Sequence, residues 1–181
     1  MRIVAGAWRG RPLAAPPGQT TRPTADRVRQ AVFDMLLHAP WGGRDAVEGA
    51  HVLDAFAGTG AMGLEALSRG AAFATFMEQD RAALAAVRRN IAACGAAGRS
   101  AVLAVDVLAA PRGEPCRLAF LDPPYGLDLL PRAVERLCAA GWLAPGALIV
   151  AESGRDETSP ALGTLLAERS HGAANLTIWR R

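Results

Sequence analysis

The sequence contains no lysine, few aromatic residues and no long apolar run. All 20 basic residues in this 181-residue chain are arginine, which together with the abundant alanine is typical of a GC-rich coding bias. No apolar stretch approaches the roughly 18 residues of a membrane-spanning helix, so we expect no membrane partner. The chain begins Met-Arg-Ile-Val without the pattern of a secretory signal, and we therefore expect a cytoplasmic protein.

Cysteine is also scarce. Cys94, Cys116 and Cys138 lie far apart in the sequence, and none forms a Cys-x-x-Cys pair. Neither a zinc site nor a disulfide framework is indicated by this spacing. We expect three reduced thiols, mostly buried, and no bound metal.

Positive charge is concentrated in the first quarter of the chain. Residues 1–44 contain seven arginines against Asp26 and Asp34, a net charge of +5, whereas the remainder has thirteen arginines against fifteen acids, a net charge of −2. This asymmetry indicates that a polyanion binds near the N-terminus, although a solvated surface is the alternative. We therefore divide the chain into an N-terminal extension (1–44), which is the expected polyanion-binding part, and a second domain (45–181).

Apolar periodicity predicts an α/β fold. Short runs at 2–5 and 11–14 predict a small hairpin, and a helix follows over about 24–38, with Arg27 and Arg29 off its apolar stripe and facing outward. From residue 51 strands and helices alternate, which favours a mainly parallel sheet with helices on both faces. Strands are predicted at 51–55, 73–78, 101–105, 118–121, 147–152, 163–169 and 174–180, and helices at 61–69, 80–94 and 128–139.

Ligands of such sheets bind at the carboxyl ends of the strands, where a glycine-rich turn follows the strand 51–55. Gly58 and Gly60 allow a tight turn and a close approach of the backbone to a ligand. The match to Gly-x-Gly-x-x-Gly, completed by Gly63, leaves a dinucleotide open as the ligand. Asp54 favours a cationic amino-acid group, as in S-adenosylmethionine, over a pyrophosphate.

The next two strands also end in acids. Glu78 is placed to accept hydrogen bonds from ribose hydroxyls, or else to favour the dipole of the following helix, where Asp80 is the expected N-cap. Asp106 is placed to accept from an adenine amino group, with Val107 as a backbone donor; a surface loop acid is the alternative.

The most specific motif is Asp122-Pro123-Pro124-Tyr125, which follows the apolar run 118–121. The two prolines hold the chain extended and supply no N–H, so the Asp122 carboxylate and the Pro123 carbonyl offer only acceptors. These acceptors can hold an exocyclic amino group and stabilise the positive charge that develops on it during methyl transfer. Tyr125 offers an aromatic face for a base, worth about 1–3 kcal/mol of stacking.

These motifs carry a resemblance to a known family. Asp54-x-Phe56-x-Gly58-x-Gly60 followed by Asp122-Pro123-Pro124-Tyr125 resembles the class I amino-methyltransferases. Three further segments are similar to the RsmD-like 16S ribosomal RNA guanine-N2 methyltransferases: 2–11 (RIVAGAWRGR), 22–29 (RPTADRVR) and 56–70 (FAGTGAMGLEALSRG). The tail 172–179 departs from the ending that we expect of this family.

The resemblance implies a Rossmann-like, seven-stranded, mainly parallel sheet with one antiparallel strand near the edge, plus the small N-terminal extension. It implies S-adenosyl-L-methionine as methyl donor, S-adenosyl-L-homocysteine as product, and a guanine of 16S rRNA as target, in an assembled or partly assembled 30S subunit bound by a monomer. The implied catalytic residues are Asp122, Pro123, Pro124 and Tyr125. The implied cofactor-binding residues are Asp54, Phe56, Gly58, Gly60, Glu78, Gln79, Asp106 and Val107. For nucleic acid we expect Arg2, Trp8, Arg9, Arg11, Arg22 and Arg27, because arginine suits phosphate and tryptophan can stack on a base.

Other functions remain open. The tetrapeptide suits adenine N6 or cytosine N4 equally well, and only the N-terminal resemblance points to guanine N2. A DNA adenine or cytosine methyltransferase is therefore the first alternative, although 181 residues leave little room for a sequence-reading domain. A non-enzymatic assembly protein and a dinucleotide oxidoreductase are disfavoured by the intact tetrapeptide, and the latter also by Asp54.

Overall fold

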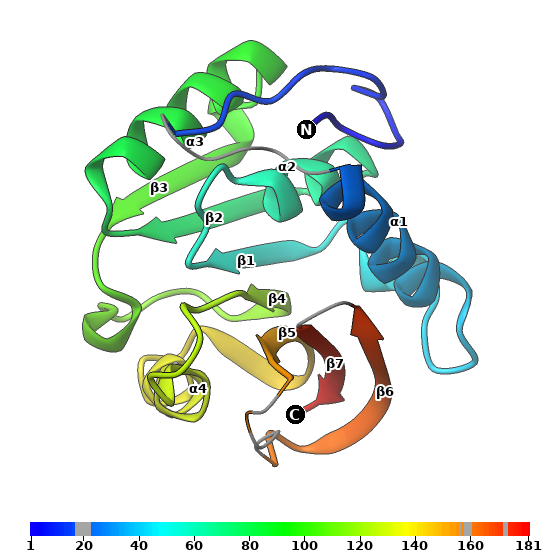
Figure 1. The fold of residues 1–181 in the computed structure, drawn as a ribbon, viewed down its shortest axis with the longest axis vertical. Coiled ribbons are helices and arrows are strands. Elements are labelled where there is room, and N and C mark those ends of the chain that lie inside the picture. The colour runs from blue at the N-terminus through cyan, green and yellow to red at the C-terminus, as the bar shows by residue number, and fades with distance from the viewer. Residues whose placement is uncertain (17–22, 156, 158–160, 172–173) are drawn as a thin grey trace.

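The computed structural model describes residues 1–16, 23–155, 157, 161–171 and 174–181 (Figure 1). Within them, seven strands form one sheet in the order β3-β2-β1-β4-β5-β7-β6. Strands β1 to β5 run parallel, and β7 is antiparallel to both β5 and β6, next to the edge. The predicted fold class is confirmed. The strands are β1 (His51–Ala55), β2 (Phe73–Glu78), β3 (Ser100–Ala104), β4 (Cys116–Leu121), β5 (Leu143–Gly154), β6 (Thr164–His171) and β7 (Ala174–Arg180).

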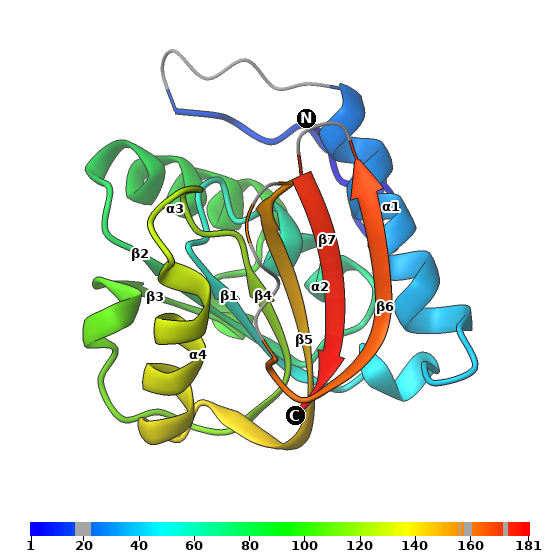
Figure 2. The ribbon, with the colours of Figure 1, turned by 60° about the horizontal axis from the view of Figure 1, so that its bottom comes forward.

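Helices cover both faces of this sheet (Figures 1 and 2). The α-helices are α1 (Pro23–His38), α2 (Ala61–Ser68), α3 (Arg81–Cys94) and α4 (Leu129–Ala139). One-turn 3₁₀ helices are η1 (Arg44–Ala46), η2 (Ala97–Arg99) and η3 (Val107–Ala109). Asp80 is the N-cap of α3, as predicted, because its side chain accepts from Ala83 N at 2.8 Å.

Two hydrophobic clusters fill the space between the sheet and its helices. Alternate residues of each strand point to opposite faces, so Val52 and Phe120 join α1, α2 and α3, whereas Leu53 and Leu121 join α4. Ile3 and Leu13 of the N-terminal segment belong to the first cluster, and both are buried. The segment before α1 is thus held by the same core as the sheet.

The N-terminal pairing is smaller than the predicted hairpin. Residues Arg2 and Pro12 form one isolated antiparallel bridge, and Ile3 N donates to Arg11 O at 2.9 Å. The chain turns between them through Gly6, whose φ is +81°, and a Cβ there would lie 1.9 Å from the Ser68 carbonyl oxygen. This close approach to the end of α2 requires glycine and fixes the segment against that helix.

One expectation for α1 is wrong. Arg27 is exposed as predicted, but Arg29 is only 3% exposed. Its guanidinium donates to Asp26 at 2.8 Å and to Glu65 of α2 at 3.3 Å. The Arg29 guanidinium can be buried because two carboxylates pair with it. Helical periodicity predicts the face on which a residue lies but not whether a partner is available there.

The remaining predicted absences concern the membrane, metals and disulfides. None of the described helices is long and apolar enough to cross a membrane. The described residues form no cluster of three or more His, Cys, Asp or Glu side chains able to hold a metal ion. Cys94 and Cys116 are buried free thiols, and Cys138 is partly exposed.

Candidate active site at the carboxyl edge of the sheet

Four parallel strands bring their carboxyl ends to the same edge of the sheet. Register pairs Ala55 of β1 with Met77 of β2 and with Leu121 of β4, and Leu121 with Ala151 of β5. The acids of these strand ends therefore gather at one edge. They are Asp54, Glu78, Asp122 and Glu152.

The glycine-rich loop after β1 has an unusual backbone. Phe56, Gly58 and Gly60 all have positive φ, at +60°, +55° and +75°. A Cβ at Gly60 would lie 2.5 Å from Val87 Cγ2, so this glycine packs directly on α3, whereas nothing lies within 4 Å of a Cβ at Gly58. For phenylalanine this conformation is strained, and such strain gathers at ligand sites. The loop backbone is thus accessible to a ligand at Gly58, and at Gly60 it packs against α3.

Asp54 braces this loop from inside the protein. It is buried, and its Oδ2 accepts from Gly63 N at 2.8 Å in the first turn of α2. Burial, together with the negative charges of Asp122 and Glu78, raises the pKa of Asp54 to about 8, despite the opposing effect of the Gly63 hydrogen bond. A cation bound at this edge would favour the ionised form of Asp54.

Glu78 ties the end of β2 to the glycine-rich loop. Its Oε2 accepts from Gly58 N, and its Oε1 accepts from Gln79 N and Asp80 N, each at 2.8 Å. A carboxylate has about four acceptor positions, so these backbone bonds leave one, on Oε2, for a ribose hydroxyl. Gln79 itself is exposed.

Asp106 lies two residues beyond the end of β3, where it caps η3. Its Oδ1 accepts from Leu108 N at 3.0 Å, and Val107 is buried. The side chain of Asp106 is partly exposed and retains Oδ2 as a second acceptor atom. This position is compatible with contact to an adenine.

The edge fits S-adenosylmethionine better than a dinucleotide. The open backbone at Gly58 allows close approach of a ligand, and the carboxylates of Glu78 and Asp106 offer acceptors for hydroxyl and amino groups. Burial is the main cause of the raised pKa of Asp54, and the negative charges of Asp122 and Glu78 at the same edge add to it. That charge attracts a sulfonium and ammonium ligand and repels a pyrophosphate.

The predicted catalytic tetrapeptide follows β4 at the same edge. Asp122 and Tyr125 are exposed, the latter by 47%, while Pro123 is buried. Desolvation by the surrounding protein and the charge of Glu152 raise the pKa of Asp122 to about 7. The Tyr125 hydroxyl donates to Glu152 Oε1, and desolvation with this bond raises the pKa of the phenol.

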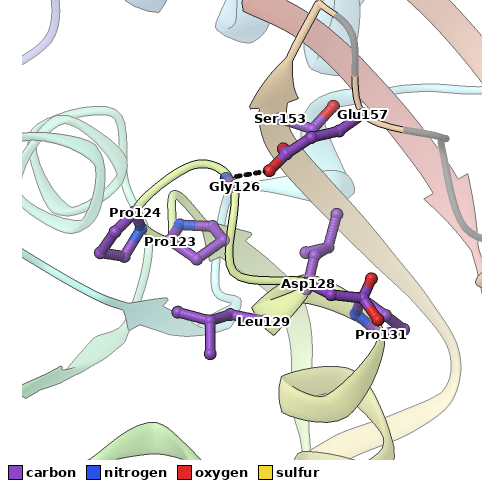
Figure 3. Close-up of a pocket in the computed structure, with 9 residues that line it drawn as sticks. Pro123, Pro124, Gly126, Asp128, Leu129, Pro131, Ser153 and Glu157 are labelled. Carbon is purple, nitrogen blue, oxygen red and sulfur yellow. Dashed lines mark hydrogen bonds between the residues drawn. The ribbon is translucent and has the colours of Figure 1, made fainter.

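Glu152 and Glu157 are site residues that the sequence reasoning missed. Glu157 Oε2 accepts from Gly154 N at 2.7 Å, and its Oε1 accepts from Gly126 N, which joins the loop after the tetrapeptide to the end of β5 (Figure 3). A pocket of about 260 Å³ lies beside this bond. Glu152 was detectable, because it ends the strand predicted over 147–152 and the same strand-end rule applies to it. The pocket is lined by Pro123, Pro124, Gly126, Asp128, Leu129, Leu130, Pro131, Ser153 and Glu157.

The predicted nucleic-acid residues are only partly brought together. Trp8, Arg9 and Arg11 line one surface hollow of about 480 Å³, where Arg11 also donates to the Ala93 carbonyl. Arg99, which the sequence reasoning missed, lies with its guanidinium carbon 5.3 Å from the centre of the Trp8 ring. Arg2 and Arg27 are exposed but do not line the hollow. The prediction for Arg22 lies outside the described residues.

Glu65 of α2 anchors the N-terminal segment. The side chain is fully buried and accepts from Val4 N at 2.8 Å, from Ala5 N at 2.9 Å, and from Arg29 and Arg69. Four donors neutralise and solvate this buried carboxylate. Because α2 begins directly after the glycine-rich loop, this short helix connects to the loop at its N-terminus and binds the N-terminal segment through Glu65.

The fold and the edge define the class. Strand order, the positive-φ glycine-rich loop and the strand-end carboxylates are those of a Rossmann-like methyltransferase fold. A solved structure described as putative methyltransferase yhhF from Escherichia coli is similar over 100% of this chain and 97% of its own, with 40% identity and a TM-score of 0.85. The putative methylase HI0767 from Haemophilus influenzae has 32% identity and a TM-score of 0.79, covering 99% and 97% of the two chains.

The family follows from the sequence comparisons. The family model described as Conserved hypothetical protein 95 matches residues 1–180, and this chain belongs to that family, the RsmD family. The Ribosomal RNA small subunit methyltransferase D of Escherichia coli K12 is 40% identical over 186 residues, 100% of this chain and 90% of its own. The protein of that name from Haemophilus influenzae is 34% identical, over 99% and 93% of the two chains. The resemblance predicted from the sequence is confirmed.

Proposed function

We propose that this protein transfers a methyl group from S-adenosylmethionine to the exocyclic N2 amino group of a guanine in the 16S rRNA of the small ribosomal subunit. The observation that carries the proposal is the position of Asp122 and Tyr125 at the end of β4, beside the glycine-rich loop of β1. That placement sets amino-group acceptors next to the candidate cofactor site. The names of the relatives, which are ribosomal RNA small subunit methyltransferases, support RNA as the substrate.

One solved structure with the same fold comes from a guanine-N2 methyltransferase. A solved structure of the 16S rRNA N2 methyltransferase RsmC of Thermus thermophilus contains AdoMet and guanosine and has a TM-score of 0.68 to this chain. Its identity is 20%, so it supports the fold, and its ligands illustrate what such a fold accommodates. That this chain also methylates guanine N2 is part of the proposal.

The cofactor residues act by position and charge. Glu78 offers its remaining acceptor to a ribose hydroxyl, and Asp106 offers Oδ2 to an adenine amino group. Phe56, Gly58 and Gly60 set the shape of the loop against which the ligand lies, and Gln79 and Val107 flank it. When bound, S-adenosylmethionine supplies an activated methyl group with a positively charged sulfur.

The tetrapeptide handles the target amino group. Asp122 and the Pro123 carbonyl accept hydrogen bonds from its two N–H groups and direct the nitrogen lone pair toward the incoming methyl group, while the exposed Tyr125 ring stacks on the flipped base. As the nitrogen gains a bond to carbon it becomes positive, and the Asp122 carboxylate stabilises this charge. The nitrogen then loses one proton, which Asp122, with a pKa of about 7, is suited to accept.

The positive N-terminal extension is the proposed RNA-binding surface. The hollow lined by Trp8, Arg9 and Arg11 offers guanidinium groups to phosphates and an aromatic ring to a base, and the exposed Arg2 and Arg27 offer further guanidinium groups. In this proposal the substrate is an assembled or partly assembled 30S subunit in the cytoplasm, and one monomer of this protein binds it.

The test uses small-subunit particles purified from cells that lack this protein. Incubation with tritiated S-adenosylmethionine, followed by nucleoside analysis, should give labelled N2-methylguanosine. Particles from cells that contain the protein are the control and should accept little label. Label in N6-methyladenosine or N4-methylcytosine would contradict the guanine assignment, and labelling of purified DNA instead would contradict RNA. Protection against proteolysis by S-adenosylhomocysteine but not by NAD tests the cofactor.

A further inference from the structure

The end of β5 adds a second carboxylate to the site, beside the tetrapeptide. Register pairs Leu121, the last residue of β4, with Ala151 of β5, so Asp122, the first residue after β4, follows a residue that pairs next to Glu152. The Glu152 carboxylate is close enough for its charge to raise the pKa of Asp122. Asp122 and Glu152 are therefore neighbouring acids at the carboxyl edge of the sheet.

The contact between Glu152 and Tyr125 determines which acceptor atom is occupied. The Tyr125 hydroxyl donates to Glu152 Oε1, which leaves Oε2 without a donor among the described residues. The neighbouring acid has a different task, because Glu157 accepts the backbone N–H groups of Gly126 and Gly154. Glu152 is thus the strand-end acid beside the tetrapeptide that keeps an acceptor oxygen for a substrate.

Two neighbouring hydrogen-bond acceptors, on Asp122 and Glu152, complement the Watson–Crick edge of guanine but not that of adenine or cytosine. Guanine presents two adjacent donors on its Watson–Crick edge, the N1–H and the N2 amino group. Adenine and cytosine instead present a bare ring nitrogen beside their amino groups, at N1 and at N3 respectively. A carboxylate aimed at that ring position accepts from guanine and repels the lone pair of the other two bases.

We propose that Glu152 accepts the N1–H of the target guanine while Asp122 and the Pro123 carbonyl hold its N2 amino group, so that Glu152 makes the site selective for guanine over adenine and cytosine. This inference rests on the proposed function. It explains how a tetrapeptide that suits three different amino groups is restricted to one of them. Glu152 is a specificity residue, and the methyl transfer itself takes place at the nitrogen held by Asp122.

Substitution of the target guanine by 2-aminopurine distinguishes a specificity role of Glu152 from a purely structural role. This base keeps the 2-amino group of guanine, but its N1 has no hydrogen and is an acceptor. Inosine has the N1–H and lacks the amino group, so it serves as the blank. The methylated nucleotide is first mapped by nucleoside and fragment analysis of particles treated with the wild-type protein. Small-subunit particles are then reconstituted from ligated 16S rRNA with guanine, 2-aminopurine or inosine at that position.

Wild-type protein should favour guanine over 2-aminopurine in kcat/KM by roughly 10- to 100-fold, the discrimination expected of a well-placed hydrogen-bonding pair. Glu152→Gln should lower kcat/KM on guanine by a similar factor and leave 2-aminopurine unchanged or improved, because the glutamine amide can donate to N1. The guanine preference is then lost or reversed. Glutamine can still accept from the Tyr125 hydroxyl, so that contact is retained.

Two control variants sharpen the result. Tyr125→Phe removes the hydroxyl that contacts Glu152 but keeps the ring, and it should leave the ratio between the two bases unchanged. Glu135→Gln removes an exposed carboxylate on α4 and should match wild type on both bases. An equal loss on both bases in Glu152→Gln would mean that Glu152 only supports Tyr125, and it would overturn the proposal. So would an unchanged guanine preference.

Failure of the proposed function has a different signature. If the target is not guanine, wild-type protein labels another nucleoside in the mapping step, before any Glu152 variant is used. If guanine N2 is methylated and the ratio is insensitive to Glu152, the proposed function stands and only the role of Glu152 is excluded. Binding of S-adenosylhomocysteine by Glu152→Gln, measured by calorimetry, should stay within about threefold of wild type, which reports an intact cofactor site.

Discussion

The carboxyl edge of the sheet and the N-terminal extension carry opposite charges in this small protein. At the edge, Asp54, Glu78, Asp122 and Glu152 lie close together, and the pKa values of Asp54 and Asp122 are raised to about 8 and about 7. In the extension, arginines prevail and Arg9 and Arg11 line a surface hollow beside Trp8. One region suits a cationic ligand and amino donors, and the other suits a polyanion.

The difference also separates two uses of the same residue type. Arg29 is buried against Asp26 and Glu65, whereas Arg9 and Arg27 are exposed. A count of charge along the sequence treats these arginines alike. Part of the positive charge near the N-terminus therefore holds the extension in place through Arg29, and the exposed arginines, such as Arg9 and Arg27, are the ones that a polyanion can reach.

The largest expected effect is the loss of the acceptor at the edge. Asp122→Ala should lower kcat for methyl transfer by about 10²–10³-fold, since a preorganised group that stabilises developing charge is removed. Affinity for S-adenosylmethionine, measured by calorimetry, should stay within roughly tenfold of wild type. Asp45→Ala, at an exposed position in η1, is the control. Substantial residual turnover in Asp122→Ala would remove Asp122 from its assigned role.

The anchor of the extension should dominate stability. Glu65→Ala leaves Arg29, Arg69 and two backbone N–H groups without their buried acceptor, and it should lower the free energy of unfolding by about 3–5 kcal/mol. Glu48→Ala removes an exposed ion pair with Arg44 and should cost only about 0–1 kcal/mol. Denaturant titration measures both. Similar small losses in the two variants would show that the anchor contributes little.

The pH dependence of transfer tests the edge directly. Asp122 stabilises the positive charge on the amino group, and can take up its proton, only when the carboxylate is ionised. Its raised pKa of about 7 means that half of the carboxylates are protonated near neutrality. Single-turnover kcat/KM should therefore fall about tenfold per pH unit below 7 and level off above it. Glu152→Gln removes a neighbouring negative charge, so its profile should shift to lower pH. A wild-type profile flat between about pH 6 and pH 8 would contradict the raised pKa.

The smallest effect is expected for single exposed arginines. Arg9→Gln and Arg27→Gln should each weaken RNA binding a few fold and reduce the slope of log affinity against log salt by about 0.7–0.9. Cofactor affinity should not change. Arg132→Gln, an exposed arginine on α4, is the matched control and should bind RNA as wild type does. Unchanged RNA affinity in both Arg9 and Arg27 variants would count against the extension as the RNA surface.

Much of the fold could be predicted because its signals are local. Alternation of strands and helices located every strand within a few residues, and the strand-end rule selected Asp54, Glu78 and Asp122, which do meet at one edge. The same rule also indicates Glu152, the last residue of the strand predicted over 147–152, which was missing from the predicted site. The predicted hairpin proved to be a single bridge, since packing of Gly6 and Ile3 on the sheet's helices holds the segment instead of a ladder.

The sequence by itself determined the class of fold, the family and the atoms offered by the tetrapeptide, because periodicity, glycine positions and a rigid proline pair are properties of contiguous residues. Only the tertiary structure decided that Arg29 is buried, that Glu65 joins the extension to α2, and that Glu152 stands beside Asp122. These facts depend on contacts between residues tens of positions apart. They are set by which strands pair and which helix covers which face, and by the requirement that every buried charge finds a partner.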